Sequence, residues 1–68
     1  MKKRVYKTEK GFRKAVNADT RKMYLDTRRD YSSKGWELVA MTADTYYVLG
    51  NLHQTEAERI ERDLQGIN

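Results

Sequence analysis

The chain has 68 residues, of which 35% are charged and 38% hydrophobic, and it contains no cysteine. A chain this short forms one domain that buries only roughly 60% of its unfolded surface, and without cysteine it has neither a disulfide framework nor a thiolate metal site. Its longest apolar run, from Leu38 to Met41, is far shorter than the ~20 residues of a membrane span, and the basic start lacks the apolar core of a signal peptide. These features predict a single soluble cytoplasmic domain over residues 1–68 that has no membrane partner.

The net charge of +4 conceals an uneven distribution along the chain. Residues 1–34 carry twelve Lys/Arg and four Asp/Glu, a net charge of +8, whereas residues 35–68 carry two and six, a net charge of −4. Two halves of opposite sign indicate either a polyanionic partner for the first half or attraction between the halves.

The amino-terminal segment is expected to form a basic hairpin. Its first strand covers residues 4–8, a turn uses Gly11 at positive φ, and a second strand runs from Phe12 to Ala18 with Phe12 and Val16 on one face. The competing interpretation is a helix that begins near Phe12, because Phe12 and Val16 also suit helical spacing.

A helix is predicted next, from about residue 20 to residue 33. Asp19 or Thr20 would be its N-cap, and Gly35 would be the left-handed residue after its C-cap. Its buried stripe would consist of Tyr24, Thr27 and Tyr31.

Two paired strands follow, over residues 36–42 and 46–52. In the first strand, Trp36 and Leu38 point to one side of the sheet and Val39 points to the other. In the second strand, Tyr46 and Val48 share one side, and Tyr47 and Leu49 share the other. Both strands are apolar on both faces, so a second layer is expected over each face of the sheet.

The carboxy-terminal segment is predicted to be a helix that begins with a capping box, Thr55 with Glu58. An apolar stripe lies on one of its sides, formed by Ala57, Ile60, Leu64 and Ile67. If this helix folds back, it covers the far side of the sheet; if it projects outward, its stripe would mediate a homodimer.

Together these elements define the expected fold class. It is α+β, a small antiparallel sheet of three to four strands with one helix after the first hairpin and a C-terminal helix. The predicted order is ββαββα, or βαββα if the first hairpin is misassigned.

The run Gly35-Trp36-Glu37-Leu38-Val39, followed by the pair Tyr46-Tyr47, resembles a family of small bacterial and phage domains of unknown function. The resemblance covers roughly residues 20 to 50 and implies a strand, a helix and two paired strands. Ala18-Asp19-Thr20, followed by the Gly35 strand, is more weakly similar to the small host RNA-polymerase inhibitor of podophages. The arginines that such inhibitors place on this strand are replaced here by Ala40 and Thr42, so no functional residue is carried over.

Catalytic and metal-binding patterns are sparse. The sole histidine, His53, gives neither a zinc ligand set nor a base with partners. Asp26 and Asp30 alternate with Arg28 and Arg29, which indicates a salt-bridged exposed face more than a carboxylate pair. The sequence therefore predicts a protein that is not an enzyme, with no cofactor and no metal.

The basic first half remains as the functional signal, because clustered cations bind phosphates with counterion release. The candidate residues for nucleic-acid or partner binding are Lys2, Lys3, Arg4, Lys7, Lys10, Arg13, Lys14, Arg21, Lys22, Arg28 and Arg29. We expect a regulatory protein that binds nucleic acid or nucleic-acid-processing machinery. The alternative is a phage-encoded inhibitor that blocks a host protein, such as RNA polymerase or a defence enzyme.

Overall fold

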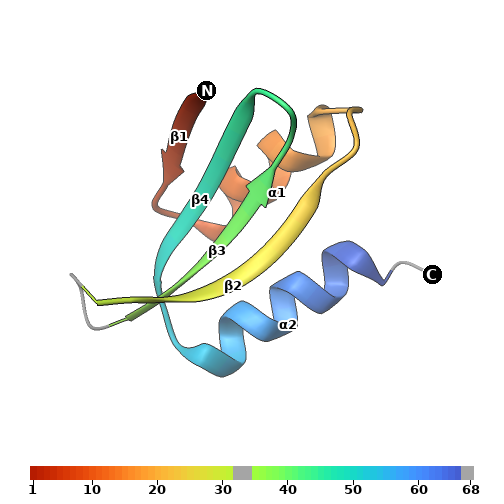
Figure 1. The fold of residues 1–68 in the computed structure, drawn as a ribbon. Coiled ribbons are helices and arrows are strands. Elements are labelled where there is room, and N and C mark those ends of the chain that lie inside the picture. The colour runs from red at the N-terminus through yellow and green to blue at the C-terminus, as the bar shows by residue number, and fades with distance from the viewer. Residues whose placement is uncertain (32–34, 67–68) are drawn as a thin grey trace.

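Figure 1 shows the computed structural model of the protein, which describes residues 1–31 and 35–66. In chain order the elements are β1 (Lys2–Tyr6), α1 (Glu9–Ala18), β2 (Tyr24–Asp30), β3 (Gly35–Met41), β4 (Thr45–Leu52) and α2 (Gln54–Gln65). The strands form one sheet in the order β1-β4-β3-β2, in which β1 is parallel to β4 and the other pairs are antiparallel. The predicted α+β class is confirmed, but the sheet is mixed and the order is βαβββα.

The segment predicted as the second strand of a hairpin is helix α1, so the competing helical interpretation is correct. Thr8 is the N-cap, and its hydroxyl accepts a hydrogen bond from the Gly11 amide at 3.1 Å. Phe12 and Val16 are buried, one turn apart on the side that faces the sheet, and Lys14 points to solvent. Gly11 therefore lies in the first helical turn, without the positive φ expected for a hairpin turn.

Residues 24–30, predicted to be helical, form the edge strand β2, which is paired antiparallel to β3 along its whole length. Leu25 and Thr27 face the helices, so a period of two replaces the predicted stripe. Tyr24 and Tyr31, expected to be buried, are 67% and 85% exposed. The pairing satisfies backbone groups along one edge of β3, which a helix in the same place would leave unpaired.

The ends predicted for that helix are also corrected. Asp19 is the C-cap of α1 and not the N-cap of a second helix, and Thr20 lies in the loop that follows it. Gly35 begins β3 without a left-handed φ, because it pairs with Asp30 across the strands. The closing residues 33 and 34 of the predicted helix lie outside the described residues.

Strands β3 and β4 pair as predicted, and the side chains predicted to share a face of the sheet do so. The register shifts between Trp36 and Leu38, where β4 contains one extra residue and Asn51 has φ 58°. This bulge explains how Leu49 and Leu52, an odd number of residues apart, both face the same core.

The two helices cover the same face of the sheet, contrary to the expected layer on each face (Figure 1). α1 packs against β1 and β4, while α2 folds back along β2 and β3. One core contains residues of both helices and of the strands between them: Phe12, Val16, Leu38, Ala40, Tyr47, Leu49, Leu52, Ala57 and Ile60. The opposite face of the sheet has no helix over it among the described residues.

Helix α2 begins two residues earlier than its predicted capping box. His53 is the N-cap, and its amide donates to Glu56 Oε1 at 3.5 Å, so Thr55 already lies inside the helix. Ala57 and Ile60 are buried and Leu64 packs against the core, which confirms most of the predicted stripe. Ile67 lies outside the described residues.

Candidate nucleic-acid interface

Six of the predicted cations lie on β1, in the turn that follows it and on the outward side of α1. We call them the amino-terminal basic surface: Lys2, Lys3, Arg4, Lys7, Lys10 and Lys14. All six are exposed. Because β1 is an edge strand, its side chains alternate between the two sides of one sheet margin. Lys10 and Lys14 lie one helical turn apart, opposite the buried Phe12 and Val16.

These six side chains have no ion pair with a carboxylate within the part of the chain that the structure describes. Their charge is therefore available to an external anion. A cluster of hydrated cations at one margin produces a positive potential that attracts polyanions.

Arg13, in contrast, is bound inside the molecule. Its Nε lies 2.7 Å from Glu9 Oε2, and its Nη2 lies 3.0 Å from Asp63 Oδ2 of α2. Arg59 completes the cluster, with 3.2 Å to Glu9 and 3.6 Å to Asp63. The hydrogen bond to Asp63 is the largest cause of the raised pKa of Arg13. This cluster ties α1 to α2 and removes Arg13 from the candidate interface.

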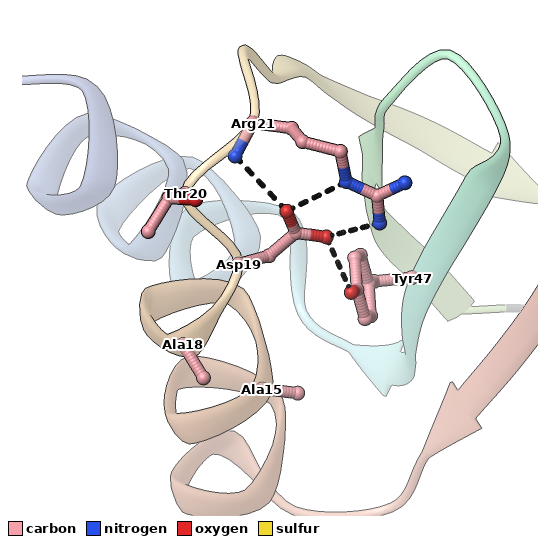
Figure 2. A pocket seen from close by; sticks show the side chains of 6 residues that line it. All are labelled: Ala15, Ala18, Asp19, Thr20, Arg21 and Tyr47. Carbon is pink, nitrogen blue, oxygen red and sulfur yellow. Dashed lines mark hydrogen bonds and ion pairs between the residues drawn. The ribbon is translucent and has the colours of Figure 1, made fainter.

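Arg21 is also engaged, at the mouth of an open depression of about 420 Å³ beside the end of α1 (Figure 2). Its backbone amide, Nε and Nη2 donate to the Asp19 carboxylate at 3.0, 2.9 and 2.6 Å, and its Nη1 donates to Asp44. The Tyr47 hydroxyl donates to the same Asp19 carboxylate at 2.7 Å. Four donors thus converge on one side chain that is 7% exposed.

The protonation equilibria follow from these contacts. The Arg21 side chain, followed by the Tyr47 hydroxyl, holds the pKa of Asp19 well below its ordinary value. The same carboxylate raises the pKa of Tyr47. The Thr45 hydroxyl, followed by Arg21, lowers the pKa of Asp44. Because each charge already has a partner, this network fixes the loop after α1 against the start of β4 and offers no unsatisfied group to a ligand.

The remaining predicted cations lie away from the basic surface. Arg28 and Arg29 are on β2, the opposite edge of the sheet, and Lys22 is in the loop before it. Arg28 Nε lies 3.2 Å from Asp26, and the Arg29 guanidinium lies 5.5 Å from the centre of the Tyr31 ring. The predicted basic hairpin and the predicted helix over residues 20–33, which would have carried Arg21, Arg28 and Arg29, are therefore wrong. The eleven cations do not form one surface.

Metal-ligating groups are not concentrated anywhere in the described residues. Within them, no group of three or more His, Cys, Asp or Glu side chains could hold a metal ion. His53 is exposed at the start of α2, and Asp26 and Asp30 lie on β2 instead of on a helix face. No helix in this part of the chain is both long and apolar enough to cross a bilayer.

Comparisons of the chain with protein-family models, curated proteins and solved structures give no match. The motif residues 35–39 lie in β3, which pairs with β4, the strand that contains Tyr46 and Tyr47. The resemblance to the small bacterial and phage domains stays a prediction.

Proposed function

We propose that this chain is a non-enzymatic binding protein whose amino-terminal basic surface engages nucleic acid through the phosphate backbone. The observation that carries the proposal is the contrast between cations of two kinds. Arg13, Arg21 and Arg28 are bound to carboxylates of the chain, whereas the six cations of β1, the turn after it and α1 have no such partner among the described residues.

The geometry suits a phosphate chain more than a compact anion. The six side chains are spread along an edge strand, the turn after it and the outward side of a helix. Two of them, Lys2 and Lys3, line the hollow beside Tyr46, and none lines the depression beside the end of α1. Each phosphate neutralised by a lysine or arginine releases counterions, so affinity from such a surface falls steeply with salt.

Fluorescence anisotropy of labelled duplex and single-stranded oligonucleotides tests the proposal at two salt concentrations, ~50 and ~200 mM, the range in which phosphate contacts are strongly screened. We expect binding at the lower concentration that weakens at the higher one. The triple variant Lys7→Glu, Lys10→Glu and Lys14→Glu should lose binding while keeping its circular dichroism spectrum. Absence of binding of either oligonucleotide at the lower salt concentration would refute the proposal.

A second candidate function, the binding and blocking of an acidic host protein, is favoured by the edge position of β1. Within the described sheet, β1 pairs only with β4, so its outer edge offers backbone groups flanked by Lys2 and Arg4. A pull-down from bacterial lysate, with and without nuclease, separates the two functions. A stoichiometric protein that survives nuclease favours inhibition, and loss of the partners after nuclease favours nucleic-acid binding.

A further inference from the structure

The face of the sheet opposite the helices carries a row of side chains that crosses all four strands. The strand registers align Lys3 of β1 with Tyr46 of β4, Tyr46 with Met41 of β3, and Met41 with Tyr24 of β2. We call this set, Lys3, Tyr46, Met41 and Tyr24, the open-face row. It begins inside the amino-terminal basic surface and ends at the far edge with a tyrosine that is 67% exposed.

The β1 end of the open-face row adjoins a hollow of about 270 Å³ that is lined by Met1, Lys2, Lys3 and Tyr46. It combines two cations, an aromatic ring and a flexible apolar side chain. These are the groups that hold a flat heterocycle next to a phosphate: the ring and thioether contact its face, and the ammonium groups contact the anion.

Tyr46 is held in place before any ligand arrives. Arg28 extends from β2 across β3, and its Nη1 donates to the Tyr46 hydroxyl at 2.9 Å. Its guanidinium carbon lies 5.7 Å from the centre of the ring. The same arginine is anchored by Asp26 at 3.2 Å. A side chain ordered in this way loses little conformational entropy on binding, which favours affinity.

Charge is distributed so that phosphates and bases would occupy different parts of this face. The open-face row contains no carboxylate. Asp26 and Glu37 are on the same face, but Asp26 lies in the adjacent row, where it is bound to Arg28, and Glu37 lies one row further away. Lys3 lies on this face at the β1 margin, and its neighbours Lys2 and Arg4 alternate with it toward the other side of the same margin. A single nucleic-acid strand whose sugar–phosphate backbone followed β1 would direct its bases inward over Tyr46 and Met41.

We propose that the open-face row is a base-stacking surface that makes this protein selective for single-stranded nucleic acid over duplex. This inference rests on the proposed function, because the basic surface supplies the phosphate contacts. In a duplex the flat faces of the bases are stacked on each other, whereas a single strand exposes them to aromatic side chains. No helix of the described residues covers the row, so unstacked bases would reach it without entering a groove.

Anisotropy titrations with a labelled single-stranded oligonucleotide and with its duplex test the selectivity. Tyr24→Ala should weaken single-strand binding about 5-fold or more, the loss expected for one stacked base, and should leave duplex binding unchanged. Tyr24→Phe should bind like the wild type, because the ring is retained. Tyr31→Ala is the matched control: Tyr31 is exposed at the end of β2 but is outside the row.

Ultraviolet cross-linking to the single strand gives an independent readout, with cross-linked peptides expected to contain Tyr24 or Tyr46. Equal affinity for single strand and duplex, with no effect of Tyr24→Ala, would overturn the stacking surface and leave the proposed phosphate binding intact. Polyglutamate, a polyanion without bases, should displace the labelled single strand less effectively than the unlabelled single strand does. If it displaces the label equally well, the stacking surface is also overturned, because charge alone would then explain binding. Failure of both oligonucleotides to bind would remove the proposed function itself.

Discussion

Removing two charges from the outward side of α1 should change the salt dependence of binding by a calculable amount. The variant Lys10→Gln/Lys14→Gln leaves Phe12 and Val16 in the core and breaks no ion pair of the described residues. If each lysine neutralises one phosphate of a single strand, each adds about 0.7 to the slope of log K against log salt. The slope should therefore become shallower by about 1.4, and the loss of affinity between ~50 and ~200 mM salt should be about 7-fold smaller than in the wild type.

The assay is anisotropy at four or more salt concentrations, because a slope is less sensitive than a single affinity to changes in active protein concentration. The control Arg29→Gln/Arg62→Gln removes the same charge from β2 and α2, away from the basic surface, and should leave the slope within about 0.3 of wild type. An equal decrease in slope for the two double variants would refute the reasoning, since it would show that net charge and not the position of the lysines governs binding.

Three further predictions concern the fold that presents this surface. Ile60→Ala, at a fully buried position of α2, should lower the free energy of unfolding by about 2–5 kcal/mol in urea titrations, and a loss below ~1 kcal/mol would contradict the docking of α2. Asn51→Val should cost about 1–2 kcal/mol in the same assay because φ is 58° there, whereas Asn51→Gly should cost nothing; equal costs would argue against the bulge. The lowered pKa of Asp19 means that its contribution to stability is complete above the ordinary aspartate pKa of about 3.8 and is lost as pH falls below it. The difference in midpoint temperature between wild type and Asp19→Asn should therefore shrink between pH 5 and pH 2, and a constant difference would show that the carboxylate charge is irrelevant.

The carboxy-terminal half of the fold could be predicted because its patterns admit one interpretation. Strands β3 and β4 are short runs that are apolar on both faces, and α2 has its apolar residues three or four apart. What the pattern could not show is which face α2 covers. Val39 and Val48 are buried on the open face, at 0% and 4% exposure, beneath neighbouring side chains and not beneath a helix.

The segment from residue 9 to residue 30 differs from its prediction because its local signals point both ways. Phe12 and Val16 fit a helix and a strand alike, and it is the Thr8 cap that distinguishes the helix from the strand. For β2, the tertiary context outweighs propensity. Tyr24 and Thr27 are good strand formers, but the residues around them lack alternation, and only pairing with β3 makes the strand necessary.

The sequence predicts that the first half of the chain is basic, but it does not predict which of its cations share one exposed surface. Sequence shows that Arg13 and Asp63 have opposite signs; it does not show that folding brings together residues fifty positions apart. The sequence does not show the open-face row for a related reason: its members come from four strands, and the helical spacing predicts that Tyr24 is buried. The available signal was the pair Tyr46-Tyr47, in which adjacent strand residues must face opposite sides of the sheet.

Some of the opposite charges of the two halves form ion pairs within the fold, and the cations of these pairs are arginines. Arg13 pairs with Asp63, and Arg21 pairs with Asp44; in each pair the arginine belongs to the basic half and the aspartate to the acidic half. A planar guanidinium can hold two carboxylates at once, as Arg13 does, whereas an ammonium is a compact, strongly hydrated charge. No lysine of the described residues has an ion pair with a carboxylate. The attraction between halves and the proposed polyanionic partner are therefore compatible: arginines hold the helices and the loop after α1 in place, and the lysines of β1 and α1 stay exposed without a carboxylate partner among the described residues.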